Sequence, residues 1–199
     1  MIDNIELIRP LLDFGDPDDF YMLYVFKRKK DQPEGEKDNH QSVRTIRSYC
    51  IGSMEQLDRR YGEIKMLCEV FKARAYIHVA KQNHSDVSLE MMIELATRIK
   101  SNSTKQQGLF DSVVSQIKTR ESRWIVDIDD VKEVSPLLMA FIDNECRPIG
   151  PKIETIIPTR NGAHLITKRF DVKTFKEKYP EIDIQRKNPT LLYYPNSLN

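Results

Sequence analysis

The chain has little cysteine and no membrane-directed segment. Its three cysteines, Cys50, Cys68 and Cys146, lie far apart in 199 residues. Zinc sites use closely paired cysteines, so this spacing gives no zinc motif, and we expect buried, reduced thiols. No apolar run approaches the length of a membrane span, and residues 1–4 lack the basic and apolar regions of a signal peptide. These features predict a cytoplasmic protein that makes no membrane contact.

An excess of charge is also missing. The chain has 31 basic and 30 acidic residues and a net charge of +1, so nothing attracts it as a whole to nucleic acid. Any basic binding site must therefore be local. The 40% hydrophobic and 31% charged content is that of an ordinary globular protein, and 199 residues suffice for one domain or two compact subdomains.

The first half of the sequence predicts an α/β subdomain. Pro10 breaks the helical spacing in residues 3–13, and Ser53 with Gln56 has the spacing of a capping box at the start of a helix. A connector at 101–108 is rich in Ser, Asn and Gln and marks a boundary. We expect an N-terminal α/β subdomain at residues 1–105 and a second subdomain at residues 106–199, which together form one compact unit. The expected elements are strands at 20–29, 43–51 and 73–81, a polar hairpin loop at 30–41, and helices at 53–71, 88–100 (capped by Ser85 or Asp86) and 110–118.

The second half predicts the order βαββαβ. Asn161-Gly162 is a strong hairpin signal between two of its strands. The expected strands are 123–129, 152–158, 163–167 and 182–184, the expected helices are 130–146 and 172–178, and an apolar segment at 191–194 is placed as an additional sheet strand. The predicted fold is therefore α+β, with a ferredoxin-like or RRM-like second half. Its helices would cover one face of the sheet and leave the other open.

The strand that ends in Asp127-Ile128-Asp129-Asp130 carries the main chemical signal. Asp127 and Asp129 share a strand face, and two neighbouring like charges are unfavourable unless a cation lies between them. A divalent metal with oxygen ligands suits this position. Alternatively, Asp129 or Asp130 caps the following helix, which leaves Asp127 unexplained.

The predicted topology brings further polar residues to this strand. In the βαββαβ topology the first strand lies between the third and fourth, so its end with Asp127 and Asp129 lies beside His164 and Asp183. The alternation of side chains along each strand puts all four residues on the open face. Taken singly, His164 and Asp183 are also compatible with ordinary surface positions. Nearby basic residues would neutralise a polyphosphate or stand as solvated charges. These are Arg160, Lys168, Arg169, Arg186 and Lys187.

Three short motifs in this half resemble those of the archaeo-eukaryotic primase (primase-polymerase) superfamily. They are Asp127-Ile128-Asp129, Gly162-Ala163-His164 and Ile182-Asp183, and Tyr76 to Lys81 is loosely similar to a nucleotide-binding strand of some members. The resemblance implies Mg²⁺ or Mn²⁺ at catalytic Asp127, Asp129 and Asp183, nucleotide phosphates held by His164, and a nucleotide-binding contribution from Lys81. We expect Arg160 or Lys168 to help His164 orient the triphosphate. The polar segment that follows the third motif and the single short helix before it depart from the family pattern.

We therefore expect a metal-dependent nucleotidyltransferase that adds nucleotides to a DNA or RNA strand in replication or repair. Its partners would be a nucleoside triphosphate, a template, and a separate helicase or replication protein. The alternatives are an inactive single-stranded nucleic-acid-binding module, a metal-dependent nuclease, and a structural or partner-binding protein. Simple RNA binding is disfavoured because the expected open face carries Ile125 and Ile166 where such modules have stacking aromatics.

Overall fold

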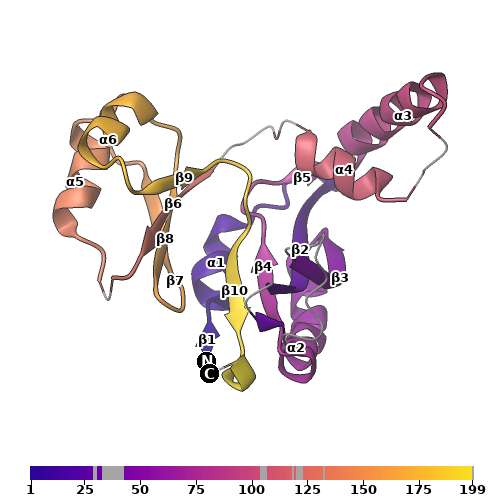
Figure 1. The fold of residues 1–199 in the computed structure, drawn as a ribbon, viewed down its shortest axis with the longest axis horizontal. Coiled ribbons are helices and arrows are strands. Elements are labelled where there is room, and N and C mark those ends of the chain that lie inside the picture. The colour runs from indigo at the N-terminus through magenta and orange to yellow at the C-terminus, as the bar shows by residue number, and fades with distance from the viewer. Residues whose placement is uncertain are drawn as a thin grey trace.

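The protein is an α+β protein with two antiparallel sheets (Figure 1). The structure is a computed structural model that describes residues 1–28, 31–32, 43–103, 107–117, 119, 123–131 and 133–198. Most of the predicted hairpin loop at 30–41 and part of the connector at 101–108 lie outside these ranges. None of the described helices has the length and apolar character needed to cross a membrane.

The first sheet contains most of the N-terminal strands and one C-terminal strand, in the order β1-β10-β4-β2-β3, with β5 beside β2. Helix α2 (Met54–Phe71) packs Leu57, Ile64 and Cys68 into the core of this sheet. The predicted cap is confirmed, because the Gln56 amide donates to Ser53 Oγ at 3.2 Å. The strands are β1 (Ile2–Asp3), β2 (Asp19–Arg28), β3 (Val43–Ile51), β4 (Arg74–Ile77), β5 (Gln82–Asn83) and β10 (Thr190–Tyr194).

Two predicted boundaries in the first half are wrong. The strand expected at 73–81 ends at Ile77, and α3 (His84–Lys100) begins earlier than predicted. Its cap is Asn83, whose side chain accepts hydrogen bonds from the amides of Ser85 and Asp86, because Asn is as good a cap as either. Helix α4 (Leu109–Gln116) packs beside α3.

The second sheet has the predicted element and strand order. Its strands are β6 (Trp124–Asp129), β7 (Ile153–Pro158), β8 (Gly162–Thr167) and β9 (Asp183–Gln185), in the order β7-β8-β6-β9. β6 is antiparallel to both β8 and β9, as expected. Helices α5 (Pro136–Asn144) and α6 (Val172–Lys178) cover the side that holds Val126, Ile128 and Leu165.

The expectation that Asp129 or Asp130 caps a helix is wrong. Helix α5 begins at Pro136 with Ser135 as its cap residue. Asp130 has a left-handed backbone (φ 57°), and the next amide, that of Val131, donates to the carbonyl of Asn161 at 3.2 Å. The chain therefore turns away from the end of β6, and the carboxylates there do not serve helix capping.

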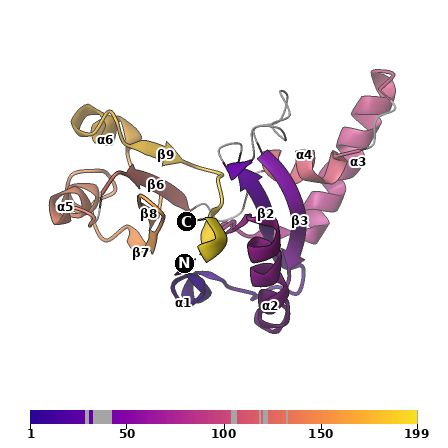
Figure 2. The ribbon, with the colours of Figure 1, turned by 60° about the horizontal axis from the view of Figure 1, so that its bottom comes forward.

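The other face of the second sheet is not open, contrary to the prediction. Ile125, Ile157 and Ile166 on that face join the apolar core of the first sheet. The segment formed by α1 (Ile5–Ile8) and the 3₁₀ turn η1 (Arg9–Leu11) contributes to the same core. Figures 1 and 2 show α5 and α6 on the outer side of the second sheet and the first sheet on its inner side. Three isoleucines left in water would be unfavourable, which explains the packing.

The last strand belongs to the first sheet. β10 pairs with β1 and β4, so the chain crosses from β9 back to the N-terminal strands. It then forms a short 3₁₀ turn, η4 (Asn196–Leu198), and the two termini lie close together (Figure 1). Asn4 links the two sheets here, because its side-chain amide donates hydrogen bonds to the carbonyls of Pro158 in β7 and Leu191 in β10, both at 2.9 Å. The division at residue 105 stays a prediction, although this pairing places residues 190–194 in the first sheet.

Candidate functional site

A cavity of about 140 Å³ lies where the two sheets meet, at the acidic end of β6. The second sheet contributes both predicted carboxylates of β6 and the turn between β7 and β8. The first sheet contributes arginine and tyrosine side chains from β2 and β4. The lining residues are Arg28, Arg74, Tyr76, Asp127, Asp129, Thr159, Arg160, Asn161, His164 and Leu191.

His164 connects the two sheets inside this cavity. The register pairs Asp127 with His164, and His164 Nε2 lies 3.4 Å from Asp127 Oδ1. The other ring nitrogen, Nδ1, lies 2.9 Å from the hydroxyl oxygen of Thr190, the first residue of β10. The His164 side chain is only 8% exposed. Contacts at both nitrogens fix the orientation of the ring.

Asp127 is held as a carboxylate. Its Oδ2 accepts a hydrogen bond from the Gln185 side chain at 2.8 Å, while Oδ1 faces His164. The hydrogen bond with His164 lowers the pKa of Asp127 against the opposing effect of burial, and the charge of Arg28 lowers it further. Asp127 is therefore ionised at neutral pH and able to bind a cation.

Two carboxylates, not three, line the cavity. Asp129 pairs with Gly162 and is an exposed residue of the cavity lining. Asp183 of β9 pairs with Asp127 of β6 but is not among the lining residues. Across the described ranges, no three His, Cys, Asp or Glu side chains lie close enough to form a metal cage. Mg²⁺ is usually bound by one or two carboxylates together with substrate phosphates, so Asp127 and Asp129 fit an ion that shares its ligands with a nucleotide.

Three arginine side chains line the same cavity as these acids. Arg160 lies over the Tyr194 ring at 5.6 Å, and Arg74 lies over the same ring at 4.8 Å. Arg28 lies over the ring of Tyr76 at 5.6 Å. Cation–π contacts of this kind restrain the arginine side chains, and planar guanidinium groups suit bidentate binding of phosphate.

Arg74 is the most buried of the three arginines. Its side chain is 4% exposed and pairs with Asp31 at 2.6 Å. Arg74 Nε and Asp31 Oδ2 have no hydrogen-bond partner in the described structure. A buried donor without a partner is costly, so an anion that reached Arg74 would be bound favourably.

Lys81 and Lys168 lie elsewhere. Lys81 pairs with Asp19 at 2.9 Å and with Asp13 at 3.2 Å, and the hydrogen bond to Asp19 is the main cause of its raised pKa. Lys168 is exposed beyond Thr167, at the opposite end of β8 from Gly162. Of the four predicted nucleotide-binding residues, the structure thus brings only His164 and Arg160 to the cavity.

Sequence reasoning did not identify Arg28, Arg74 or Thr190. In β2 and β4 the pairing of Phe26 with Arg74 puts both arginines on one face, where the rings of Phe26 and Tyr76 stack at 4.6 Å. Strand alternation could have predicted this aromatic and basic face. Nothing local in the sequence indicates that it meets Asp127.

Comparison with known proteins adds no further information about this site. No protein-family model, no curated protein and no solved structure gives a significant match to the chain. The interpretation of the cavity therefore rests on its geometry and charge.

Proposed function

We propose that the protein is a metal-dependent nucleotidyltransferase of the primase-polymerase type, which binds a nucleoside triphosphate in the cavity between its two sheets. The observation that carries this proposal is a single cavity lined by two carboxylates and three arginines. Carboxylates suit Mg²⁺ or Mn²⁺, and arginines suit phosphate groups. The ferredoxin-like, RRM-like arrangement of a primase core, with an α/β half before it, is part of the same proposal.

Each residue has a defined role in this proposal. Asp127 and Asp129 hold the ion, and Asp183, which lies opposite Asp127 on β9 but outside the cavity lining, adds negative charge near the site without binding the ion itself. The ion, when bound, favours deprotonation of the attacking 3′-hydroxyl and stabilises the departing pyrophosphate. Arg28 and Arg160 neutralise the triphosphate at the cavity.

The buried groups position the substrate. His164, fixed between Asp127 and Thr190, orients a phosphate oxygen. The ion pair with Asp31 holds the buried Arg74 side chain in place, so its positive charge stays at the site with or without a bound nucleotide.

The template needs a place outside the packed interface. Because Ile125, Ile157 and Ile166 are buried between the sheets, we place the DNA or RNA strand at the exposed mouth of the cavity, beside Asp129 and Asp183. A separate helicase or replication protein would present that strand.

The test compares the wild type with Asp127→Asn/Asp129→Asn in the extension of a labelled primer and in synthesis on an unprimed template, with Mg²⁺ and with Mn²⁺. Removing both metal ligands while keeping their shape is expected to lower incorporation by at least about a thousandfold, which is the scale of losing metal-based stabilisation. Glu177→Gln, an exposed acid on α6, is the matched control and keeps full activity.

Other outcomes favour the alternatives. Equal incorporation by both proteins, or none by the wild type with either metal, contradicts the proposal. A labelled strand that is shortened with Mn²⁺ indicates a nuclease. Strong oligonucleotide binding that is indifferent to metal and nucleotide indicates a binding module.

A further inference from the structure

The polar segment at residues 185–190, which runs from the end of β9 into β10, makes direct contacts with the candidate site. The roles proposed above use only its last residue, Thr190, through the contact with His164. The middle of the segment is bound to α4, because Lys187 Nζ donates to the carbonyl oxygen of Gln116 at 2.7 Å. Contacts on both sides of the segment therefore restrain the residues between them.

Gln185 begins this segment and contacts Asp127. In the register of β6 and β9, Gln185 lies opposite Ile125, so it is the diagonal neighbour of Asp127 on the same face of the sheet. A long side chain can reach a diagonal neighbour, and Gln185 Nε2 donates a hydrogen bond to Asp127 Oδ2 at 2.8 Å. The other carboxylate oxygen, Oδ1, lies 3.4 Å from His164 Nε2. Each oxygen of Asp127 therefore has its own neighbour, and together these neighbours set the orientation of the carboxylate.

Asn188 orients the side-chain amide of Gln185. A carboxylate only accepts hydrogen bonds, so Gln185 turns its NH₂ group toward Asp127 and its oxygen away from it. Asn188 Nδ2 donates to that oxygen at 3.0 Å. Asn188 is exposed, whereas Gln185 is partly buried. The hydrogen bonds therefore run inward from the surface, from Asn188 to Gln185 and from Gln185 to Asp127.

We propose that Gln185 and Asn188 are positioning residues that orient Asp127 for the metal ion. This inference rests on the proposed function, because it takes Asp127 as a ligand of Mg²⁺ or Mn²⁺. An ion that is bound by only two carboxylates depends on the orientation of each of them. Loss of a hydrogen-bond partner that orients a metal ligand typically weakens metal binding by about 10–100-fold. Neither residue binds the ion itself.

The test measures the dissociation constant of Mn²⁺ for the full chain by electron paramagnetic resonance of the free ion. Gln185→Met keeps the length of the side chain but cannot donate, and it is expected to raise this constant by about 10–100-fold. Asn188→Ala removes only the outer hydrogen bond and is expected to raise it by about two- to tenfold. The double variant is expected to bind Mn²⁺ no more weakly than Gln185→Met alone, because Asn188 acts through Gln185.

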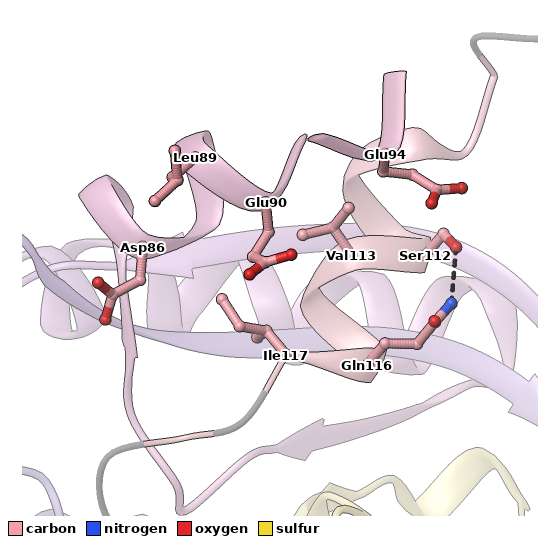
Figure 3. Close-up of a pocket in the computed structure, with 8 residues that line it drawn as sticks. All are labelled: Asp86, Leu89, Glu90, Glu94, Ser112, Val113, Gln116 and Ile117. Atoms are coloured by element: carbon pink, nitrogen blue, oxygen red, sulfur yellow. Dashed lines mark hydrogen bonds between the residues drawn. The ribbon is translucent and has the colours of Figure 1, made fainter. Parts of the chain in front are cut away.

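The matched control is Gln116→Met in α4. Figure 3 shows the Gln116 side chain beside Ser112, to whose Oγ it donates a hydrogen bond at 3.0 Å. The control therefore loses a comparable hydrogen bond away from the cavity, and it is expected to keep the wild-type constant for Mn²⁺. It leaves unchanged the carbonyl oxygen of Gln116 that accepts from Lys187.

A second measurement separates positioning from a general loss of structure. Without metal, a non-hydrolysable nucleoside triphosphate is expected to bind through Arg28 and Arg160, which Gln185 does not orient. Gln185→Met should therefore keep the metal-free dissociation constant of this nucleotide within about twofold of the wild-type value. A variant that is merely unfolded would lose both the ion and the nucleotide.

The outcomes distinguish this inference from the proposed function. No Mn²⁺ binding by the wild type, or binding that Asp127→Asn/Asp129→Asn does not weaken, contradicts the proposed function and the inference with it. If that double variant loses the ion but Gln185→Met binds it as the wild type does, only the inference is overturned. The inference is also overturned by an equal loss in Gln116→Met, by equal losses of ion and metal-free nucleotide in Gln185→Met, or by effects of Gln185→Met and Asn188→Ala that add.

Discussion

At the scale of single residues, His78 links burial to pH. It follows β4, and its ring meets that of Tyr24 edge to face at 5.7 Å. Burial lowers the pKa of His78 from 6.5 to about 4. Between pH 6.5 and pH 4, His78 is therefore protonated in the unfolded chain but still largely neutral in the folded chain. Stability contributed by the neutral ring is thus present above pH 6.5 and is lost toward pH 4.

This linkage predicts the effect of His78→Phe. The substitution keeps an aromatic ring against Tyr24 but cannot titrate, so the free energy of unfolding should fall less steeply between pH 6.5 and 4. The wild type should lose roughly 3 kcal/mol more than the variant over that interval. Urea unfolding of both proteins at several pH values measures the difference. Parallel pH profiles would show that His78 does not titrate as argued.

At the scale of elements, the pairing of β6 with β8 sets the geometry of the site. Gly162 lies opposite Asp129, and an added Cβ at this position would lie 1.9 Å from the carbonyl oxygen of Ile128. That oxygen belongs to the backbone and cannot move without separating the strands. The close approach explains why glycine begins β8, beside the turn that carries Arg160.

Gly162→Ala should therefore destabilise the protein by about 1–3 kcal/mol, the usual cost of overpacking. It should also reduce nucleotide incorporation, because the shift moves Asp129. The matched control is Gly62→Ala within α2, where nothing lies within 4 Å of the new Cβ. Alanine is the better helix former, so this control should gain about 0.5–1 kcal/mol. Equal stability of Gly162→Ala and wild type in urea unfolding would contradict the argument.

The elements also show which parts of the structure the sequence can predict. The order of β6 to β9 and the alignment of Asp127 with His164 follow from local signals, namely alternation along each strand and the Asn161-Gly162 turn. The start of α5 was missed because aspartates after a strand resemble helix caps. Asp130 instead takes a left-handed turn conformation.

At the scale of the whole molecule, the sequence does not predict how the two sheets pack together. The apolar segment at 191–194 predicts a strand, but its own residues do not reveal which sheet that strand joins. The same limit applies to Ile125 and Ile166, whose strand face packs against the first sheet. Arg28 and Arg74 reach the cavity only through that packing, so no local pattern could have placed them beside Asp127.

The central claim is that one cavity between the sheets binds a metal–nucleotide complex. It is tested most directly by anomalous scattering from crystals grown with Mn²⁺ and a non-hydrolysable nucleoside triphosphate. We predict a manganese peak bonded to Asp127 and Asp129, with the triphosphate in contact with Arg28 and Arg160. A nucleotide and its ion bound away from these residues, or neither bound at saturating concentration, would contradict the claim.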